Sequence, residues 1–193
     1  MGGAAATFWR AGAFALAMIA VIQGSNRRSN ATLPFAQLVT EVLAAESEVS
    51  TLIDLTHLPA DILHPDMYAP ADHAYLQAAE DALKAAPKWV FLFPEYNGSF
   101  PGALKLFVDA LSVRDYAGIF SGKKAALIGT ASGRSGNIRG IDHLGAVLMH
   151  MGTSVLPGGL PISQIDGLLT DGEVTDATTR KTLRKYLRRF LAF

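Results

Sequence analysis

The chain has 193 residues, 50% of them hydrophobic, which suits one domain with a single core of ordinary size. Lysine plus arginine and aspartate plus glutamate number 17 each, so the net charge gives no general attraction to nucleic acid or to an anionic membrane. The sequence has no cysteine, which excludes disulfides, a thiolate nucleophile and cysteine metal sites and fits a reducing compartment.

The amino-terminal segment combines Arg10 with an apolar run from Ala11 to Ile22, an arrangement similar to a secretory signal. This run is shorter than the roughly 20 apolar residues that cross a bilayer. Its second half, from Met18 to Ile22, has the composition of a buried strand. We therefore expect residues 1–17 to be an extension, residues 18–193 to form one domain, and the protein to be cytoplasmic, without membrane contact.

Short apolar runs that have the length of buried strands recur along the chain. They are Met18–Ile22, Val49–Leu55, Trp89–Phe93, Ala125–Gly129 and Ser154–Leu156. Apolar residues recur at helical spacing within residues 35–43, 75–86, 103–113 and 138–151, and a last apolar stripe runs over residues 183–191. Strands that alternate with helices predict a parallel sheet built from βαβ units.

For these units we predict an α/β three-layer sandwich whose five-stranded parallel sheet has the order 2-1-3-4-5. In this order, ligands bind beyond the carboxyl ends of the strands, where the winding direction reverses between strands 1 and 3. Three polar loops leave strands 1, 3 and 4. They are the first loop, GSNRRSN (24–30), the second loop, PEYNGS (94–99), and the third loop, TASGRSGN (130–137). The sequence therefore predicts one ligand site made by three neighbouring loops.

The first loop has the composition of an anion site. It leads into a helix, whose opening turn has unpaired backbone N–H groups and the positive end of a dipole. The neutral donors and the cations that it adds are Ser25, Ser29, Asn30, Thr32, Arg27 and Arg28. A phosphate fits this set, and a helix cap flanked by solvated arginines is the alternative that the pattern leaves open.

The second loop offers a flat ring in Tyr96, a carboxamide in Asn97 and an unobstructed backbone at Gly98. These groups suit a planar heteroaromatic ligand with donors and acceptors along its edge. An ordinary β-turn accounts for Asn97 and Gly98 but not for the whole loop. In the third loop, Gly133 and Gly136 allow backbone N–H groups to approach the other edge of the same ligand.

Other possible sites are weaker. The spacing of His57, His64 and His73 matches no metal-binding motif, so we expect no metal. The basic run over residues 180–189 has apolar residues interleaved at helical spacing, which indicates a packed surface helix and not a nucleic-acid contact.

The strand that runs into PEYNGSFPGALK and then FVDAL resembles the NAD(P)H-dependent FMN reductase family of the flavodoxin-like fold. The resemblance extends from Met18 over nearly the whole chain. It includes GSNR after the first strand and residues 129–157, which look like the family's fourth strand, flavin loop, helix and fifth strand. It implies a single flavodoxin-like FMN-binding domain over residues 18–193, with FMN bound and NADPH or NADH as co-substrate.

In that family the first loop binds the FMN phosphate, and the other loops hold the isoalloxazine ring. The resemblance implies that the phosphate ligands are Ser25, Arg27, Ser29 and Asn30, with Thr32 as a further candidate. It implies that the ring is lined by Pro94, Glu95, Tyr96, Asn97, Gly98, Ser99, Ser132, Gly133, Arg134 and Gly136. The family usually has two residues between the arginine and the next serine of the first loop, and here only Arg28 stands there.

The resemblance implies an oxidoreductase that passes hydride from a nicotinamide to FMN and on to a quinone, an azo compound or free flavin. No catalytic side chain is needed, because the flavin N5 carries the chemistry. A homodimer or homotetramer is also implied, with the helix at residues 103–113 at the interface, although its apolar residues fit core packing equally well. Two alternatives are an electron carrier of the flavodoxin type, without nicotinamide activity, and a flavodoxin-like domain that has lost its cofactor.

Overall fold

The computed structural model describes residues 18–68 and 73–193, so the expected extension over residues 1–17 lies outside the described part. The strands of the central sheet are β1 (Ile19–Gln23), β2 (Ser50–Asp54), β3 (Lys88–Pro94), β4 (Lys124–Thr130), β5 (Ser154–Val155) and β6 (Leu160–Ile162). The main helices are α1 (Leu33–Ala45), α2 (Ala74–Ala85), α3 (Gly102–Phe120), α4 (Ile138–His150) and α5 (Ala177–Ala192). All pairs in this sheet are parallel, and the predicted order, β2-β1-β3-β4-β5, is confirmed.

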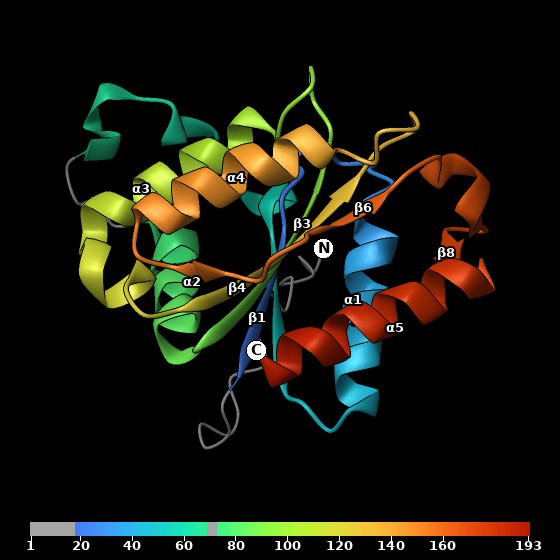
Figure 1. Ribbon diagram of the computed structural model, residues 1–193. Coiled ribbons are helices and arrows are strands. Elements are labelled where there is room, and N and C mark those ends of the chain that lie inside the picture. The colour runs from blue at the N-terminus through green and yellow to red at the C-terminus, as the bar shows by residue number, and fades with distance from the viewer. Residues whose placement is uncertain (1–17, 69–72) are drawn as a thin grey trace, which may run out of the picture.

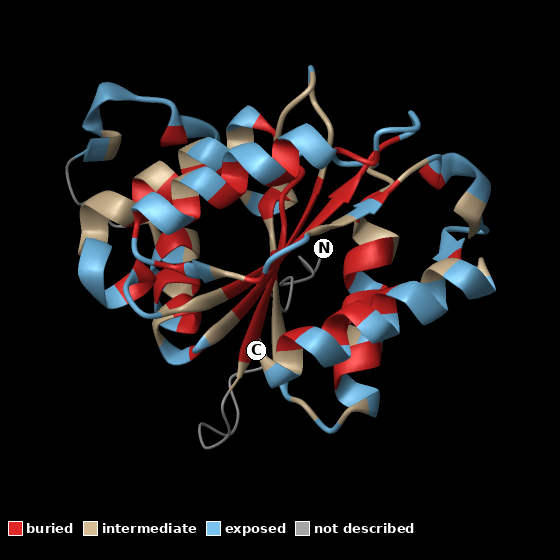
Figure 2. Ribbon diagram, in the orientation of Figure 1, coloured by how far each residue is buried: buried red, intermediate tan, exposed pale blue. Residues whose placement is uncertain are grey.

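The helices form layers on both faces of the sheet (Figure 1). One buried cluster joins α2, α3 and α4 to one face of the sheet, and a second cluster joins α1 and α5 to the other face. Strand β1 is buried at each of its five positions. This burial follows from its place between two strands and two helix layers, and it explains the unbroken apolar run in the sequence. Figure 2 shows buried residues along the sheet and on the inner sides of the helices.

The fifth position of the sheet is shared by two short strands, a division that the sequence pattern did not predict. Strand β5 pairs with β4 at Lys124 and Ala125, and β6 pairs with β4 from Ile128 to Thr130. Between them the chain reads LPGG, and a proline cannot donate to a ladder. The segment after β5 therefore contains a further strand, which continues the pairing along β4 toward the carboxyl end of that strand.

Tyr186 of α5 fills the interruption between β5 and β6. Its hydroxyl donates to the carbonyl oxygen of Leu127 at 3.0 Å and accepts from the Leu127 amide at 3.1 Å. Both polar backbone groups of this β4 residue are thereby satisfied by one side chain. Desolvation raises the pKa of the Tyr186 hydroxyl, which stays protonated and able to serve as both donor and acceptor.

Helix α3 is longer than predicted and is broken at Asp115, whose φ of −157° and ψ of 84° are not helical. The Asp115 carboxylate accepts from the Gly118 amide at 2.9 Å, so it caps a short second helical piece. The apolar residues of the first piece that could have formed an interface are at most 1% exposed and belong to the core; they are Leu104, Phe107, Val108 and Leu111.

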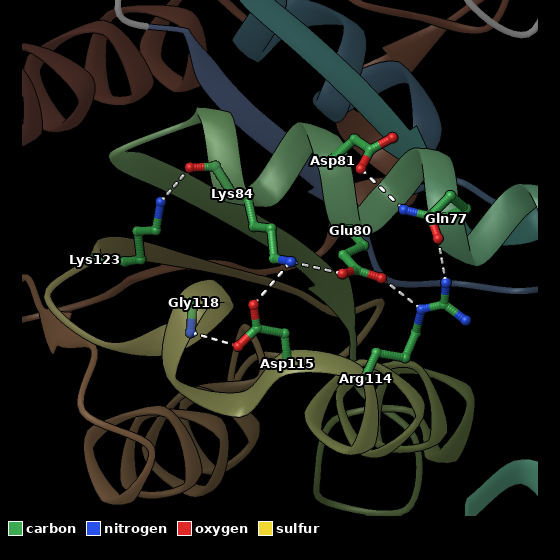
Figure 3. Close-up of polar contacts among 8 residues, drawn as sticks. All are labelled: Gln77, Glu80, Asp81, Lys84, Arg114, Asp115, Gly118 and Lys123. Atoms are coloured by element: carbon green, nitrogen blue, oxygen red, sulfur yellow. Dashed lines mark hydrogen bonds and ion pairs between the residues drawn. The ribbon is translucent and has the colours of Figure 1, made fainter. Parts of the chain in front are cut away.

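A charged contact joins α2 to α3 (Figure 3). Arg114 Nε donates to Glu80 Oε2 at 2.6 Å, and Lys84 Nζ donates to Glu80 Oε1 at 2.7 Å. Burial raises the pKa of Glu80, but the hydrogen bonds and charges of Lys84 and Arg114 outweigh burial and place this pKa below its ordinary value. The ionised carboxylate therefore ties the two helices together at neutral pH.

The remaining elements lie outside these layers. Three short 3₁₀ helices, η1 (Leu55–His57), η2 (Ala60–Ile62) and η3 (Pro65–Tyr68), follow β2, and η4 (Ile165–Leu168) precedes the hairpin of β7 (Leu169–Thr170) and β8 (Glu173–Val174). No helix within residues 18–68 and 73–193 has the length and apolar character to cross a bilayer. In the same residues no cluster of three or more possible metal ligands occurs. The basic carboxy-terminal helix packs through Leu183, Tyr186, Leu187 and Phe190, as predicted.

Candidate functional site

The first, second and third loops meet at one edge of the sheet, because parallel strands end on the same side (Figure 1). The Tyr96 hydroxyl oxygen of the second loop lies 3.1 Å from Ser25 Oγ of the first loop. On the other side of the second loop, Ser135 Oγ of the third loop donates to Glu95 Oε2 at 2.6 Å. Side-chain contacts therefore link the three loops into one surface, as the strand order predicted.

The start of the first loop is fixed by two features of the sheet. The Gly24 amide donates to the carbonyl oxygen of Leu92 at 2.8 Å. A Cβ atom on Gly24 would lie 2.8 Å from Phe93 Cβ, so only glycine fits against β3. The buried side chain of Gln23 accepts from the Ser25 amide and donates to Asp54 Oδ1 at 2.9 Å. The sequence analysis missed Gln23, although a polar residue at the end of an apolar strand was a visible signal.

Two of the predicted phosphate ligands are covered. Ser25 is 0% exposed, and its hydroxyl accepts from the Arg27 amide at 3.3 Å in addition to its contact with Tyr96. Thr32 is 1% exposed, and its hydroxyl lies 3.3 Å from that of Thr130 in the third loop. In this structure both hydroxyls bind other protein groups and have little access to solvent.

The amino-terminal turn of α1 also differs from the expectation of unpaired donors. The Leu33 amide donates to Asn30 Oδ1 at 2.9 Å, and the amides of residues 35 and 36 donate to the Thr32 carbonyl oxygen at 3.1 Å. Residue 34 is a proline without an N–H group. Asn30 Nδ2 donates to the carbonyl oxygen of Arg27 at 2.8 Å, so Asn30 stabilises the loop from within. The helix thus contributes the positive end of its dipole, while Arg27, Arg28 and Ser29 are exposed donors.

The second loop is a tight turn at its tip. The amide of Tyr96 donates to the carbonyl oxygen of Ser99 at 2.9 Å, and the amide of Ser99 donates to the carbonyl oxygen of Tyr96 at 3.1 Å. Asn97 and Gly98 both have positive φ, 52° and 75°, as a two-residue hairpin turn of the Asn-Gly type requires. The β-turn interpretation of these two residues was therefore correct. A Cβ atom on Gly98 would meet only Arg139 Nη1, at 4.0 Å, so the space beside this backbone is open.

Two residues that were not predicted to belong to the site support it: His143 of α4 contacts the second loop, and Asn137, just before α4, contacts the end of β3. Ser99 Oγ lies 2.9 Å from His143 Nδ1, and His143 is exposed on the surface of the helix. The buried side chain of Asn137 donates from Nδ2 to the carbonyl oxygen of Phe93 at 3.2 Å. Asn137 adopts a left-handed conformation, with φ of 65°, at the start of α4. Its place in the third loop was the only signal in the sequence.

The third loop presents exposed groups on one side and packs against β6 on the other. Ser132, Gly133 and Arg134 are exposed, and no atom lies within 4 Å of a Cβ position on Gly133. Gly136 has a φ of 60°, and a Cβ atom on it would lie 2.8 Å from Pro161 Cβ, so only glycine fits against β6 at this position. Beside this loop is a hollow of about 450 Å³ lined by Ser132, Gln164, Asp166, Gly167 and Leu168.

The fold and the three connected loops define a flavodoxin-like α/β protein. Residues 17–166 match the sequence model of the family described as NADPH-dependent FMN reductase, so the chain belongs to the NADPH-dependent FMN reductase family. It is an oxidoreductase of a family that uses FMN and NAD(P)H. The resemblance of the PEYNGS and GSNR segments to this family is thereby confirmed.

Curated relatives and solved structures agree with this assignment. An NAD(P)H-dependent FMN reductase of Pseudomonas aeruginosa is 30% identical over 139 residues, 71% of this chain and 74% of the relative. A quinone reductase of Pseudomonas putida is 27% identical over 183 residues, 91% of this chain and 93% of the relative. The structure of a flavoenzyme NAD(P)H:acceptor oxidoreductase of Paracoccus denitrificans has a TM-score of 0.75 at 26% identity and covers 92% of this chain and 96% of that one.

The residues at the three loops fit FMN. The exposed arginines of the first loop provide charge for an acidic group, next to the positive end of the α1 dipole. Open space beside the backbone at Gly98 and Gly133 allows a flat ring to approach the second and third loops closely. The distribution of these groups, charged at one end and open at the other, matches a ligand with a phosphate at one end and a planar ring at the other.

Proposed function

We propose that this protein is an FMN-dependent NAD(P)H:quinone oxidoreductase whose flavin binds across the first, second and third loops. The observation that carries the proposal is the pair of contacts, Ser25 with Tyr96 and Ser135 with Glu95, that join these loops into one surface. A surface that spans all three loops is suited to a ligand with two chemically different ends.

In the proposed complex, Arg27 and Ser29 of the first loop bind the phosphate, and Asn30 and Thr32 hold the shape of that loop. The ring lies between the second and third loops. The second-loop residues Pro94, Glu95, Asn97, Gly98 and Ser99 and the third-loop residues Ser132, Gly133 and Arg134 line it, and Gly136 allows the third loop to pack on β6. These loops orient the ring and exclude water from one side of it.

The proposed acceptor is a quinone. This choice is supported by the relatives named quinone reductase, among them those of Pseudomonas putida and Escherichia coli, which align over 91% of this chain. Bound FMN supplies the hydride acceptor for the nicotinamide and the hydride donor for the quinone. The protein contributes position, electrostatics and the open face on which the two substrates bind in turn, so we expect ping-pong kinetics.

The test uses the purified protein, stripped of bound flavin. Addition of FMN should quench flavin fluorescence in a saturable titration, and NADH or NADPH added without oxygen should bleach the bound flavin. A benzoquinone should then restore the yellow colour, whereas an azo dye should restore it more slowly. A bound flavin that neither nicotinamide bleaches would contradict the proposed activity, and absence of flavin binding would contradict the site itself.

We also propose that the protein is a homodimer, one of the two oligomers, homodimer or homotetramer, that the sequence resemblance implied. Support comes from large apolar side chains that the described part leaves exposed on α3 and α4: Tyr116 at 43%, Ile138 at 51% and Met149 at 59%. Sedimentation equilibrium should give about twice the chain mass of 20.5 kDa. A concentration-independent monomer would contradict this proposal without affecting the proposed flavin site.

A cytoplasmic location is part of the proposal, because the reaction needs a supply of reduced nicotinamide. The absence of cysteine from the 193-residue sequence is compatible with it. Fractionation of cells that make the full chain should recover the protein with cytoplasmic markers, and recovery with membrane or secreted markers would contradict the proposed location.

A further inference from the structure

The second loop has a side-chain contact with α4 that plays no part in closing its turn. Ser99 Oγ lies 2.9 Å from His143 Nδ1. The turn itself is closed by the backbone amide and carbonyl groups of Tyr96 and Ser99. The shape of the turn therefore does not depend on the Ser99 hydroxyl, which is available for chemistry.

The two partners of this contact differ in their access to water. Ser99 is half-buried in the loop that is proposed to line the ring, whereas His143 is exposed on α4. An imidazole has two ring nitrogens, so when Nδ1 contacts Ser99, Nε2 remains for exchange with solvent. The pair therefore forms a path of two groups from solvent to the ring-lining loop.

The charged groups around this path leave His143 as the one that changes its proton content most readily. A Cβ atom on Gly98 would lie 4.0 Å from Nη1 of Arg139, which precedes His143 by one turn of α4, so a permanent cation stands beside the loop tip. The carboxylate of Glu95 is turned to the third loop, where it accepts from a serine hydroxyl. Histidine is the side chain that ordinarily gains and loses a proton near neutral pH.

The proposed reaction needs an acid on the side of the acceptor. A quinone becomes a hydroquinone when it gains a hydride and a proton. Bound FMN supplies the hydride, whose electron pair reduces the quinone to a hydroquinone monoanion. The proton must then reach the charged oxygen of this monoanion from a donor beside the open face of the ring.

We propose that Ser99 and His143 deliver this proton from solvent to the acceptor. As the charged oxygen takes the proton of the Ser99 hydroxyl, Ser99 Oγ takes a proton from Nδ1 of the protonated imidazole. The electron pair of the broken N–H bond stays on nitrogen, and the neutral imidazole regains a proton from solvent. Ser99 is thus a catalytic residue, and His143 is a positioning residue that restores its proton. The inference rests on the proposed function, because it supplies the proton for the same acceptor.

The experiment compares two acceptors of the nicotinamide-reduced protein, mixed without oxygen. Benzoquinone takes a hydride and a proton, whereas ferricyanide takes electrons only. In His143→Gln the rate of reoxidation by benzoquinone should fall about 100-fold, the lower end of what a positioned general acid contributes. Reoxidation by ferricyanide and bleaching by NADH should not change. His150→Gln, at an exposed histidine of the same helix, is the matched control and should change none of these rates.

Ser99→Ala tests the other member of the path and keeps the backbone bonds of the turn. It should slow reoxidation by benzoquinone as His143→Gln does, and the double variant should be no slower than the slower single variant, because the two groups act in series. A readout without flavin is the NMR signal of the imidazole nitrogens, which Ser99→Ala should shift at His143 but not at His150. Circular dichroism and the thermal midpoint should confirm that each variant is folded.

The remaining outcomes separate this inference from the proposed function. Equal slowing of both acceptors in His143→Gln would show that His143 only supports the loop and would overturn the inference, as would an unchanged benzoquinone rate. Unchanged nitrogen signals of His143 in Ser99→Ala would overturn it too. All three results leave the proposed function standing. A wild-type protein that binds no flavin, or whose flavin no nicotinamide bleaches, would contradict the proposed function itself.

Discussion

At the residue scale, the polar groups of the first loop divide into those that build the loop and those that face solvent. Ser25, Asn30 and Thr32 bond to other protein atoms, and two of them are almost completely buried. The sequence predicted which loop would be rich in donors. It could not predict which donors face outward, because that depends on Tyr96 and Thr130 from segments far along the chain.

Arg27 and Arg28 provide a matched pair of substitutions. The amide of Arg27 donates to Ser25 Oγ, and its carbonyl oxygen accepts from Asn30, so its backbone is fixed within the loop. Arg27→Ala should therefore raise the FMN dissociation constant about 10- to 100-fold by loss of a charge-assisted bond. Arg28→Ala should have a smaller effect. Fluorescence titration checks both variants, and a larger loss in Arg28→Ala would contradict the assignment of Arg27 to the phosphate.

At the element scale, the strands and helices with strong periodicity were predicted with small errors at their ends. The division of the fifth sheet position into β5 and β6 was missed, because a two-residue strand and a three-residue strand carry no periodic signal. The extension of α3 beyond residue 113 was missed because the apolar spacing stops where Asp115 breaks the helix. Both features depend on tertiary contacts, those of Tyr186 with Leu127 and of Arg114 with Glu80.

Tyr186→Phe tests how much the Tyr186 hydroxyl contributes to stability at the interruption between β5 and β6. The variant keeps the ring but leaves the buried amide and carbonyl groups of Leu127 without the hydroxyl that satisfies them. The free energy of unfolding should fall by about 2 to 6 kcal/mol, since each of the two unsatisfied buried groups costs about 1 to 3 kcal/mol. Urea unfolding measures this change, with Tyr116→Phe as a control at an exposed tyrosine. Equal stability of the two variants would show that water or a backbone shift replaces the hydroxyl.

At the scale of the whole molecule, the layer architecture and strand order followed from the alternation of apolar runs and helical stripes. These features are set by burial on both faces of the sheet, which any parallel α/β fold requires. The meeting of the three loops at one edge followed from the strand order alone. The support that α4 gives to the second loop did not, because His143 and Ser99 are distant in sequence and neither belongs to a recognisable pair.

The stability of the domain should depend on pH through Glu80. Its pKa is lower in the folded state than the ordinary value of 4.5, so its contribution is present above that value and is lost as the pH falls through the folded pKa. Glu80→Gln should reduce the free energy of unfolding at neutral pH by about 3 kcal/mol, because Arg114 then loses its buried partner. The difference between the variant and the wild type should shrink as the solution is acidified below about pH 4.5. Urea unfolding over this range checks the prediction, and a difference that does not change with pH would contradict it.

The central claim is that three loops at one sheet edge bind a single FMN molecule. A crystal structure of the protein with FMN tests it most directly. We expect the phosphate to lie at the first loop and the ring to lie between the second and third loops. Electron density for FMN at another place, or bound by only one of the three loops, would contradict it.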